Sequence, residues 1–168
     1  MLTAYIGLGS NLNNPSEQLK KAGRQIAALA GIERFFMSSL YQSAPLGPKN
    51  QPHYVNAVAE IDTSLSPDDL LAELMQIEAL LGRVRSGERW SARIIDLDIL
   101  LYGDKTINSA RLTIPHPGLY ERAFVLYPLH EIAPHIEIPG YGSLSQLLMT
   151  CDKGDLMLLS DINRNTVA

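Results

Sequence analysis

The hydrophobic pattern at the start of the chain predicts a strand followed by an amphipathic helix. Residues 3–8 are rich in β-forming side chains, and residues 9–11, Gly-Ser-Asn, are expected to turn the chain out of this strand. Asn14 suits the N-cap of a helix, with Glu17 as its capping-box partner. Apolar residues then recur at helical spacing, and Gly31 is expected to end the helix.

The same reasoning predicts three more strands and a second helix. Strands are expected at residues 33–43, 54–61 and 94–102, where β-forming residues alternate or cluster. Between the last two, Ser66 begins a helix whose apolar stripe stops at Gly82. The order βαββαβ is that of the split βαβ, or ferredoxin-like, arrangement. We therefore expect an α+β protein with a ferredoxin-like core, whose sheet is covered by helices in αβα layers.

Beyond residue 103 the pattern is weaker and predicts elements added to the C-terminal end of this core. A proline-bearing loop at 114–118 precedes a helix expected near 119–132, and another short helix is expected at 143–149. Neither an internal repeat nor a linker separates these elements from the core. We expect a single domain over residues 1–168.

Two carboxylates are predicted to project from one face of the strand at 94–102. Side chains alternate along a strand, so Asp96 and Asp98 share a face, together with Tyr102, and their Cα atoms lie roughly 7 Å apart. Two carboxylates in so apolar a segment need a cation, or one of them must stay protonated, and oxygen ligands suit Mg²⁺. A pair of aspartates bound to arginines remains the alternative. The other face is apolar and is expected to lie on the core: Ile95, Leu97, Ile99 and Leu101.

An arginine-rich loop around Trp90 precedes this strand. Guanidinium groups bind phosphate in a bidentate manner and neutralise the charge that builds during phosphoryl transfer. Trp90 could cover a nucleotide base or pack beneath the loop, and a solvated charged loop is the alternative interpretation. The arginines are Arg83, Arg85, Arg89 and Arg93.

Two further polar residues stand in unusual surroundings. Asn56 lies in the middle of a predicted strand, on the same face as Tyr54 and Val58, where its amide could face a planar heterocycle or be a satisfied core amide. His116 lies between two prolines and near basic residues, so it could donate to a phosphate or be structural. Pattern alone does not choose between these alternatives.

Composition narrows the class of protein. The 168 residues carry a formal net charge of −4, which argues against general binding to nucleic acid or to an anionic membrane. A single cysteine excludes an internal disulfide and a cysteine-built zinc site. The chain has neither a Walker A motif nor an apolar run of membrane-spanning length. We expect a cytoplasmic monomer.

Three motifs follow one another along the chain: AYIGLGSNL at 4–12, RWSAR at 89–93 followed by DLD at 96–98, and IPHP at 114–117 with ERAFVL at 121–126. In this order they resemble one known family, the 6-hydroxymethyl-7,8-dihydropterin pyrophosphokinases of folate biosynthesis. The likeness covers residues 3 to about 134. The alternative from another class is a non-catalytic ferredoxin-like domain that binds a small molecule.

The resemblance implies that ATP gives its β,γ-diphosphate to the hydroxymethyl group of the pterin, leaving AMP. Asp96 and Asp98 would ligate two Mg²⁺ ions, and Arg83 and Arg93 would contact the phosphates. The other ATP-contacting positions would be Glu78, Arg85, Trp90, Ile99, Arg111, Thr113, His116 and Arg122. The pterin would be bound by the main chain of Ser43 and Leu46, by the Asn56 amide, and by Tyr54 and Phe124 stacking on its two faces.

The sequence departs from the family pattern at a few of these positions. Ser91 and Ala92 stand where the family commonly has Gly-Pro, and Ile94 stands where threonine is frequent. Met75 replaces a glutamine that often precedes the helix glutamate. These changes concern the loop and one nucleotide contact, and they leave the aspartate pair intact.

Overall fold

The strands expected from the hydrophobic pattern form one antiparallel sheet in a computed structural model of the chain, which describes residues 1–45, 50–82 and 94–160. β1 (Leu2–Ser10) pairs with β4 (Tyr54–Thr63) on one side and with β5 (Asp96–Tyr102) on the other. β2 (Ile32–Met37) and β3 (Tyr41–Ser43) both pair with β4. A short C-terminal strand, β10 (Met157–Leu158), pairs with β3 and completes the order β10-β3-β4-β1-β5.

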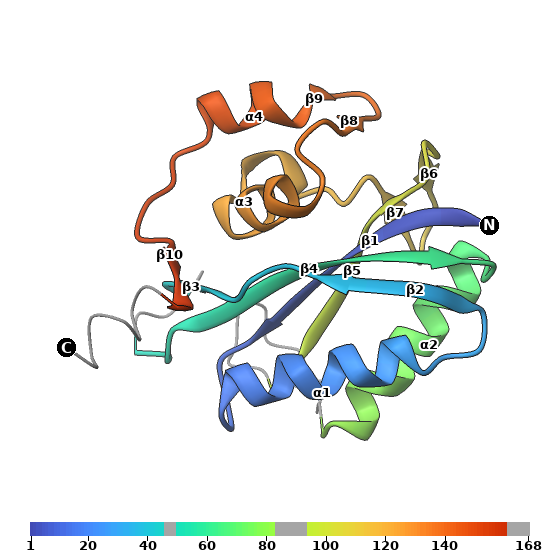
Figure 1. Ribbon diagram of the computed structural model, residues 1–168, viewed down its shortest axis with the longest axis horizontal. Coiled ribbons are helices and arrows are strands. Elements are labelled where there is room, and N and C mark those ends of the chain that lie inside the picture. The colour runs from blue at the N-terminus through green and yellow to red at the C-terminus, as the bar shows by residue number, and fades with distance from the viewer. Residues whose placement is uncertain (46–49, 83–93, 161–168) are drawn as a thin grey trace.

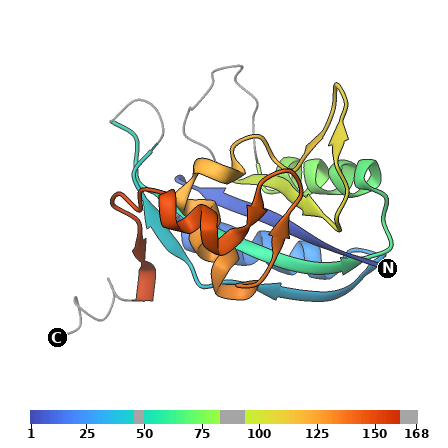
Figure 2. The same ribbon diagram turned by 90° about the horizontal axis from the view of Figure 1, so that it is seen from above.

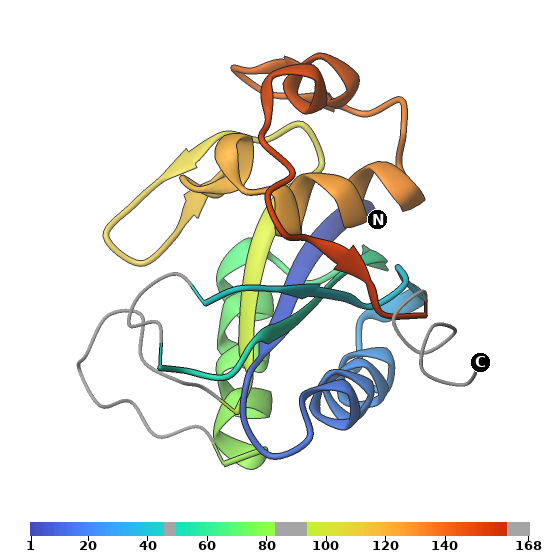
Figure 3. The same ribbon diagram turned by 90° about the vertical axis from the view of Figure 1, so that its left-hand side faces the viewer.

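Helices cover both faces of this sheet (Figures 1 and 3). α1 (Pro15–Ala27) and α2 (Pro67–Leu80) lie on one face, and α3 (Ala123–Ile132) and α4 (Leu144–Thr150) lie on the other. The sequence builds these layers because alternate strand residues enter different cores. Ile6 and Leu8 join the core under α1 and α2, whereas Tyr5 and Val58 join the core under α3. The expected α+β class is confirmed.

Short elements lie around these layers. Viewed from above, α3 and α4 cross the sheet, and a hairpin lies to their side (Figure 2). No helix among the described residues has both the length and the apolar character needed to cross a membrane. The remaining elements are β6 (Ile107–Asn108) paired with β7 (Thr113–Ile114), the 3-10 helix η1 (Leu119–Glu121), and β8 (Glu137–Ile138) paired with β9 (Gly142–Ser143).

The strand expected at 33–43 is interrupted, so the prediction of one continuous strand is wrong. β2 ends at Met37 and β3 begins at Tyr41. At the break, the main-chain N–H of Ser38 donates to Val58 O (2.8 Å), while Ser38 Oγ accepts from Val58 N (2.9 Å). The serine hydroxyl takes over one hydrogen bond of the ladder, which lets the strand change direction without leaving a buried amide unsatisfied.

A β-bulge limits how far the side chains of β5 alternate between the two faces of the sheet. Tyr5 pairs with Leu101 but Ile6 pairs with Ile99, so Leu100 is an extra residue on β5. The alternation of faces therefore shifts after Ile99. Leu101 lies in the core under α3 rather than with Ile99, and Tyr102 lies in the core under α1 and α2. The expected faces of these two residues are wrong, while those of residues 95–99 are confirmed.

The two long helices begin differently. Ser66 caps α2 as expected, because its Oγ accepts from the N–H of Asp69 (3.1 Å). Asn14 occupies the N-cap position of α1 as expected, but it has φ 61° and its side chain makes no cap hydrogen bond, so the expected capping box is wrong. α1 ends at Ala27 with Ala28 as its C-cap, so the expectation that Gly31 ends the helix is wrong; Gly31 takes a positive φ of 91° in the turn that follows.

Candidate active site

A pocket opens on the α3 face of the sheet, above two glycines in β1. Gly7 lies between Val58 of β4 and Asp98 of β5 in the strand register, and Gly9 lies between Asn56 and Asp96. Because a glycine carries no side chain, this part of β1 forms a low floor between an amide and two carboxylates. A Cβ on Gly9 would meet Asn56 Oδ1 at 3.3 Å, so the floor has little spare room.

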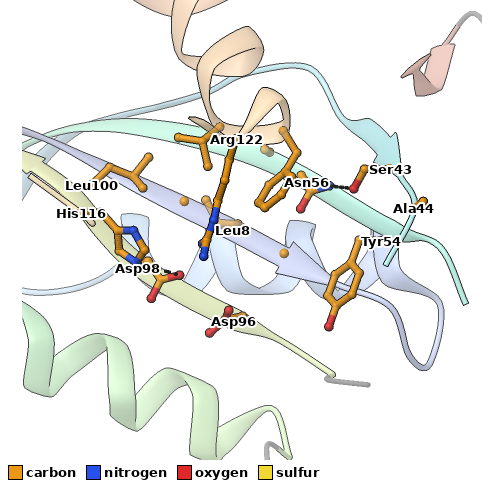
Figure 4. Close-up of a pocket in the computed structure, with 15 residues that line it drawn as sticks. Leu8, Ser43, Ala44, Tyr54, Asn56, Asp96, Asp98, Leu100, His116 and Arg122 are labelled. Carbon is orange, nitrogen blue, oxygen red and sulfur yellow. Dashed lines mark hydrogen bonds and ion pairs between the residues drawn. The ribbon is translucent and has the colours of Figure 1, made fainter. Parts of the chain in front are cut away.

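The walls come from segments far apart in the sequence. The pocket holds about 720 Å³ including its open mouth. Aromatic, amide, carboxylate, imidazole and guanidinium groups all reach it (Figure 4). Its lining consists of Gly7, Leu8, Gly9, Ser43, Ala44, Tyr54, Asn56, Ala57, Asp96, Asp98, Leu100, His116, Arg122, Phe124 and Val125.

The carboxylate wall is formed by Asp96 and Asp98. Both line the pocket from one face of β5, as the alternation of side chains predicted. The Asp98 side chain is 42% exposed, so it can reach a ligand in the pocket. In the described part of the chain, no cluster of three or more His, Cys, Asp or Glu residues could hold a metal alone. Two carboxylates on one wall fit a hard cation that takes its other ligands from water and phosphate.

His116 presents a ring N–H to this wall. Its main-chain N–H donates to Leu100 O (3.0 Å), which fixes the His116 loop beside β5. Its Nδ1 accepts from the N–H of Gly118 (3.1 Å), so in the neutral ring the proton is on Nε2, 3.9 Å from Asp98 Oδ2. Burial lowers the pKa of His116, Arg122 lowers it further, and Asp96 acts in the opposite direction. The ring is therefore a neutral donor at pH 7.

Arg122 enters the pocket from the start of α3. It occupies the N-cap position of that helix, and its side chain points down toward Asp98 and His116 (Figure 4). Its Cζ lies 5.8 Å from the centre of the Phe124 ring. Gly118 makes room for the guanidinium, because a Cβ at that position would overlap it.

The opposite wall combines an amide with aromatic rings. Asn56 is only 5% exposed, yet it lines the pocket together with Tyr54 and Phe124. Asn56 Nδ2 donates to Ser43 Oγ (2.8 Å), and the neighbouring strands bring these residues together because Ser43 pairs with Tyr54. The expectation that Tyr54 and Asn56 share a face is confirmed. Asn56 is thus both a hydrogen-bonded buried amide and part of the pocket wall.

Several residues singled out from the sequence lie elsewhere. Glu78 is 3% exposed on α2, where its Oε2 accepts from the N–H of Leu97 (3.1 Å) at the outer edge of β5. The Ile99 side chain is buried in the core under α1 and α2, on the face away from the pocket. Arg111 and Thr113 are exposed near the β6–β7 hairpin. The positions outside the described residues are Leu46, Arg83, Arg85, Arg89, Trp90, Ser91, Ala92 and Arg93.

Sequence reasoning missed the glycine floor and the room left by Gly118. Residues 9–11 were expected to turn the chain, but β1 continues through Ser10, so Gly7 and Gly9 lie inside a strand. Their spacing of two residues is the signal that places both on one face. Nothing in the local sequence around Gly118 indicates its contact with Arg122, which depends on how η1 and α3 fold back.

The chain is similar to known proteins over most of its length. Residues 5–134 match the family described as 7,8-dihydro-6-hydroxymethylpterin-pyrophosphokinase (HPPK). A 2-amino-4-hydroxy-6-hydroxymethyldihydropteridine pyrophosphokinase from Haemophilus influenzae is 52% identical over 148 residues, which cover 88% of this chain and 92% of that protein. The protein of the same name from Pseudomonas aeruginosa is 46% identical over 147 residues, covering 88% and 90%.

A crystal structure of wild-type HPPK-DHPS from Plasmodium falciparum has the same fold. Its TM-score is 0.66 at 14% sequence identity, with 87% of this chain and 44% of that chain covered. This chain thus spans less than half of that solved chain, and the likeness concerns the fold alone. From the family match and the sequence identities, the chain belongs to the 7,8-dihydro-6-hydroxymethylpterin-pyrophosphokinase family.

Proposed function

We propose that the pocket above Gly7 and Gly9 is where this pyrophosphokinase carries out its reaction. The enzyme transfers a diphosphate from ATP to the hydroxymethyl group of 6-hydroxymethyl-7,8-dihydropterin, giving AMP, in folate biosynthesis. The observation that carries the proposal is the division of the pocket by β1: Asp96 and Asp98 lie on one side, and Asn56 with its aromatic neighbours lies on the other.

The wall formed by Asn56, Tyr54 and Phe124, here called the amide wall, suits the pterin. A pterin is a flat heterocycle with hydrogen-bond donors and acceptors along its edge, so it needs ring contacts on its faces and an amide at its rim. Tyr54 and Phe124 would stack on the two faces, while Asn56 would hydrogen-bond the edge. We assign main-chain contacts with the same ring to Ser43 and Leu46.

The carboxylate wall suits two magnesium ions. Asp96 and Asp98 would hold them, and the ions would supply positive charge to the oxygens of the transferred phosphates. Two observations support this assignment: both side chains face the pocket, and Asp98 is well exposed. His116, neutral at pH 7, would add a hydrogen-bond donor beside them without repelling the cations.

The nucleotide would extend from the pocket along the outer edge of β5. Among the described strands β5 pairs only with β1, so no described strand lies along its other edge. The Leu97 N–H points to that edge, where Glu78 accepts it, and alternation along the strand directs the Ile99 main chain the same way. Ile99 would therefore contact the nucleotide through its main chain rather than its buried side chain.

The remaining nucleotide contacts are proposed from the family likeness. Arg122 points toward the carboxylate wall, which supports a contact with the phosphates. We assign phosphate contacts to Arg83 and Arg93 as well. The other assigned ATP contacts are Arg85, Trp90, Arg111, Thr113 and His116.

The reaction needs positioning more than covalent help from the protein. The pterin hydroxyl oxygen forms a bond to the β-phosphorus of ATP and releases its proton to water, the bond between that phosphorus and the oxygen bridging to the α-phosphate breaks, and AMP leaves in line. The amide wall holds the alcohol, while the guanidinium of Arg122 and the ring Nε2–H of His116 donate to phosphate oxygens. We assign no dedicated general base among the residues of the chain.

Three broader features complete the proposal. If β2 and β3 count as two halves of one strand, the core has the ferredoxin-like order, and the observed pairing of both with β4 supports this. We also propose that residues 1–168 are one pyrophosphokinase domain. It would act as a monomer without a nucleic-acid or membrane partner, in keeping with the net charge of −4.

One assay tests the proposal. AMP release from ATP should require both the hydroxymethyl dihydropterin and Mg²⁺, and EDTA should abolish it. AMP release without the pterin or in EDTA would contradict the assignment. A non-catalytic binding domain, the rival interpretation, would bind the pterin in a titration but release no AMP. Adding back excess Mg²⁺ after EDTA controls for loss of the fold.

A further inference from the structure

The wall that carries Ser43 is built on an unusually short strand. β3 has only three residues, Tyr41–Ser43, and is cut off from β2 by the break at residues 38–40. On one side it pairs with β4. A strand this short is weakly held by one neighbour, so its position depends on what pairs with its other edge.

The C-terminal segment occupies that other edge (Figures 1 and 3). Met157 pairs with Gln42 and Leu158 pairs with Tyr41, antiparallel to β3. The next residue, Leu159, donates its N–H to Leu40 O (2.9 Å), which extends the contact into the break. The segment is anchored in turn by Leu156, which is 3% exposed.

The same segment also contacts the pocket wall where β3 ends. Asp155 Oδ1 accepts from the N–H of Ala44 (3.4 Å), and both Ala44 and Ser43 line the pocket. Ser43 Oγ in turn accepts from Asn56 Nδ2 (2.8 Å). A connected path of hydrogen bonds and neighbouring residues therefore joins Asp155 to the amide proposed to recognise the pterin.

We infer that residues 155–159 position the pterin-binding wall by holding β3 and Ala44 against β4. The inference rests on the proposed location of the pterin in this pocket. The segment lies beyond residues 5–134, the part that matches the family. It acts through Ser43 and Asn56 and touches no reacting atom, so these are positioning residues. Their loss should weaken pterin binding while leaving ATP binding and the chemical step in place.

The test compares Asp155→Ala with Asp155→Asn. The alanine removes the acceptor for the Ala44 N–H, and KM for the pterin should rise about two- to tenfold with kcat and KM for ATP unchanged. The asparagine keeps an acceptor oxygen and should restore the wild-type KM, because the contact needs an acceptor rather than a charge. Leu156→Ala loosens the anchor itself and should raise the pterin KM further.

Two controls separate positioning from general loss of stability. Met149→Ala changes an apolar side chain of α4 that is 85% exposed, and it should leave every kinetic constant unchanged. Thermal melts must show that each variant is folded at the assay temperature. In a Ser43→Ala background, Asp155→Ala should raise the pterin KM by less than it does alone, because both act on the same amide.

The outcomes are distinct. An unchanged pterin KM in both Asp155→Ala and Leu156→Ala would overturn the inference, and so would equal rises in KM for pterin and for ATP. Full additivity with Ser43→Ala would overturn the path through Ser43. By contrast, a wild-type protein that releases no AMP in the presence of pterin and Mg²⁺ would refute the proposed function itself.

Discussion

Asp98 Oδ2 lies 3.9 Å from Nε2 of His116, although the two residues belong to different elements of the fold. They meet because the main-chain N–H of His116 donates to Leu100 O, which fixes the loop that carries His116 beside β5. The main-chain N–H of Gly118 donates to Nδ1 of His116, so the proton of the neutral imidazole is on Nε2 and faces the carboxylate. A neutral donor beside a carboxylate leaves the negative charge of Asp98 available to a cation.

Asp98→Ala should therefore remove turnover without unfolding the protein. The side chain is 42% exposed, so its loss leaves no buried cavity, whereas the proposed metal site loses one of its two carboxylates. We expect kcat to fall by about 100-fold or more, measured as AMP release. Asp104→Ala, which removes an exposed aspartate from the turn after β5, is the matched control. Full activity of Asp98→Ala would show that the metal assignment is wrong.

Gly118→Ala should impair the enzyme through Arg122. Gly118 has φ −93°, which alanine adopts readily, so backbone strain is not the cause. The added Cβ would overlap the Arg122 guanidinium and push it from its position in the pocket. We expect kcat/KM for ATP to fall about tenfold or more.

Arg122→Ala provides the comparison for Gly118→Ala. If Gly118 acts by making room for the guanidinium, the double variant should be no worse than Arg122→Ala alone. Additive losses, or a Gly118→Ala enzyme with wild-type kinetics, would show that the space beside Gly118 does not matter for the arginine.

The alternation of side chains between the two faces of β5 explains which parts of the site could be predicted from the sequence. Asp96 and Asp98 were placed on one face because strict alternation holds up to Ile99. The bulge at Leu100 could not be predicted in the same way, because an extra apolar residue in an apolar run leaves no trace in the pattern. Leu101 and Tyr102 were therefore assigned to the wrong faces.

The wall that carries Asn56 and Tyr54 shows a second limit of prediction from local sequence patterns. Asn56 and Tyr54 could be placed on one face, but the Ser43 hydroxyl that binds the amide comes from a neighbouring strand. Pairing between strands sets such contacts, and it depends on the whole sheet. Gly9 was expected in a turn because the run Gly-Ser-Asn at 9–11 is typical of one, and only the strands on both sides reveal it as a floor.

Asn56→Ala should weaken pterin binding selectively. The alanine removes the amide proposed to bind the edge of the ring and leaves the Ser43 hydroxyl without this donor. We expect KM for the pterin to rise about tenfold or more, with little change in KM for ATP. Asn108→Ala, at an exposed position of β6, is the control. Equal changes in both KM values would contradict a role for Asn56 at the pterin.

Tyr41→Phe should make the protein less sensitive to alkaline pH. Burial raises the pKa of Tyr41 from 10.0 to about 12, and Glu131 raises it in the same direction. Between these values the unfolded chain loses the phenolic proton while the folded protein keeps it, so the free energy of unfolding falls as pH rises above 10. Below pH 10 this contribution to stability is fully present. Phenylalanine cannot ionise, so its variant should lose less stability in that window.

Melting temperatures measured from pH 8 to pH 11 check this expectation. The wild-type curve should fall more steeply above pH 10 than the Tyr41→Phe curve. Tyr5 and Tyr102, whose pKa values are also raised by burial, remain in both proteins, so the difference between the curves isolates Tyr41. Tyr120→Phe, which changes a tyrosine that is 40% exposed, should keep the wild-type slope. Parallel curves for wild type and Tyr41→Phe would show that Tyr41 ionises equally in both states.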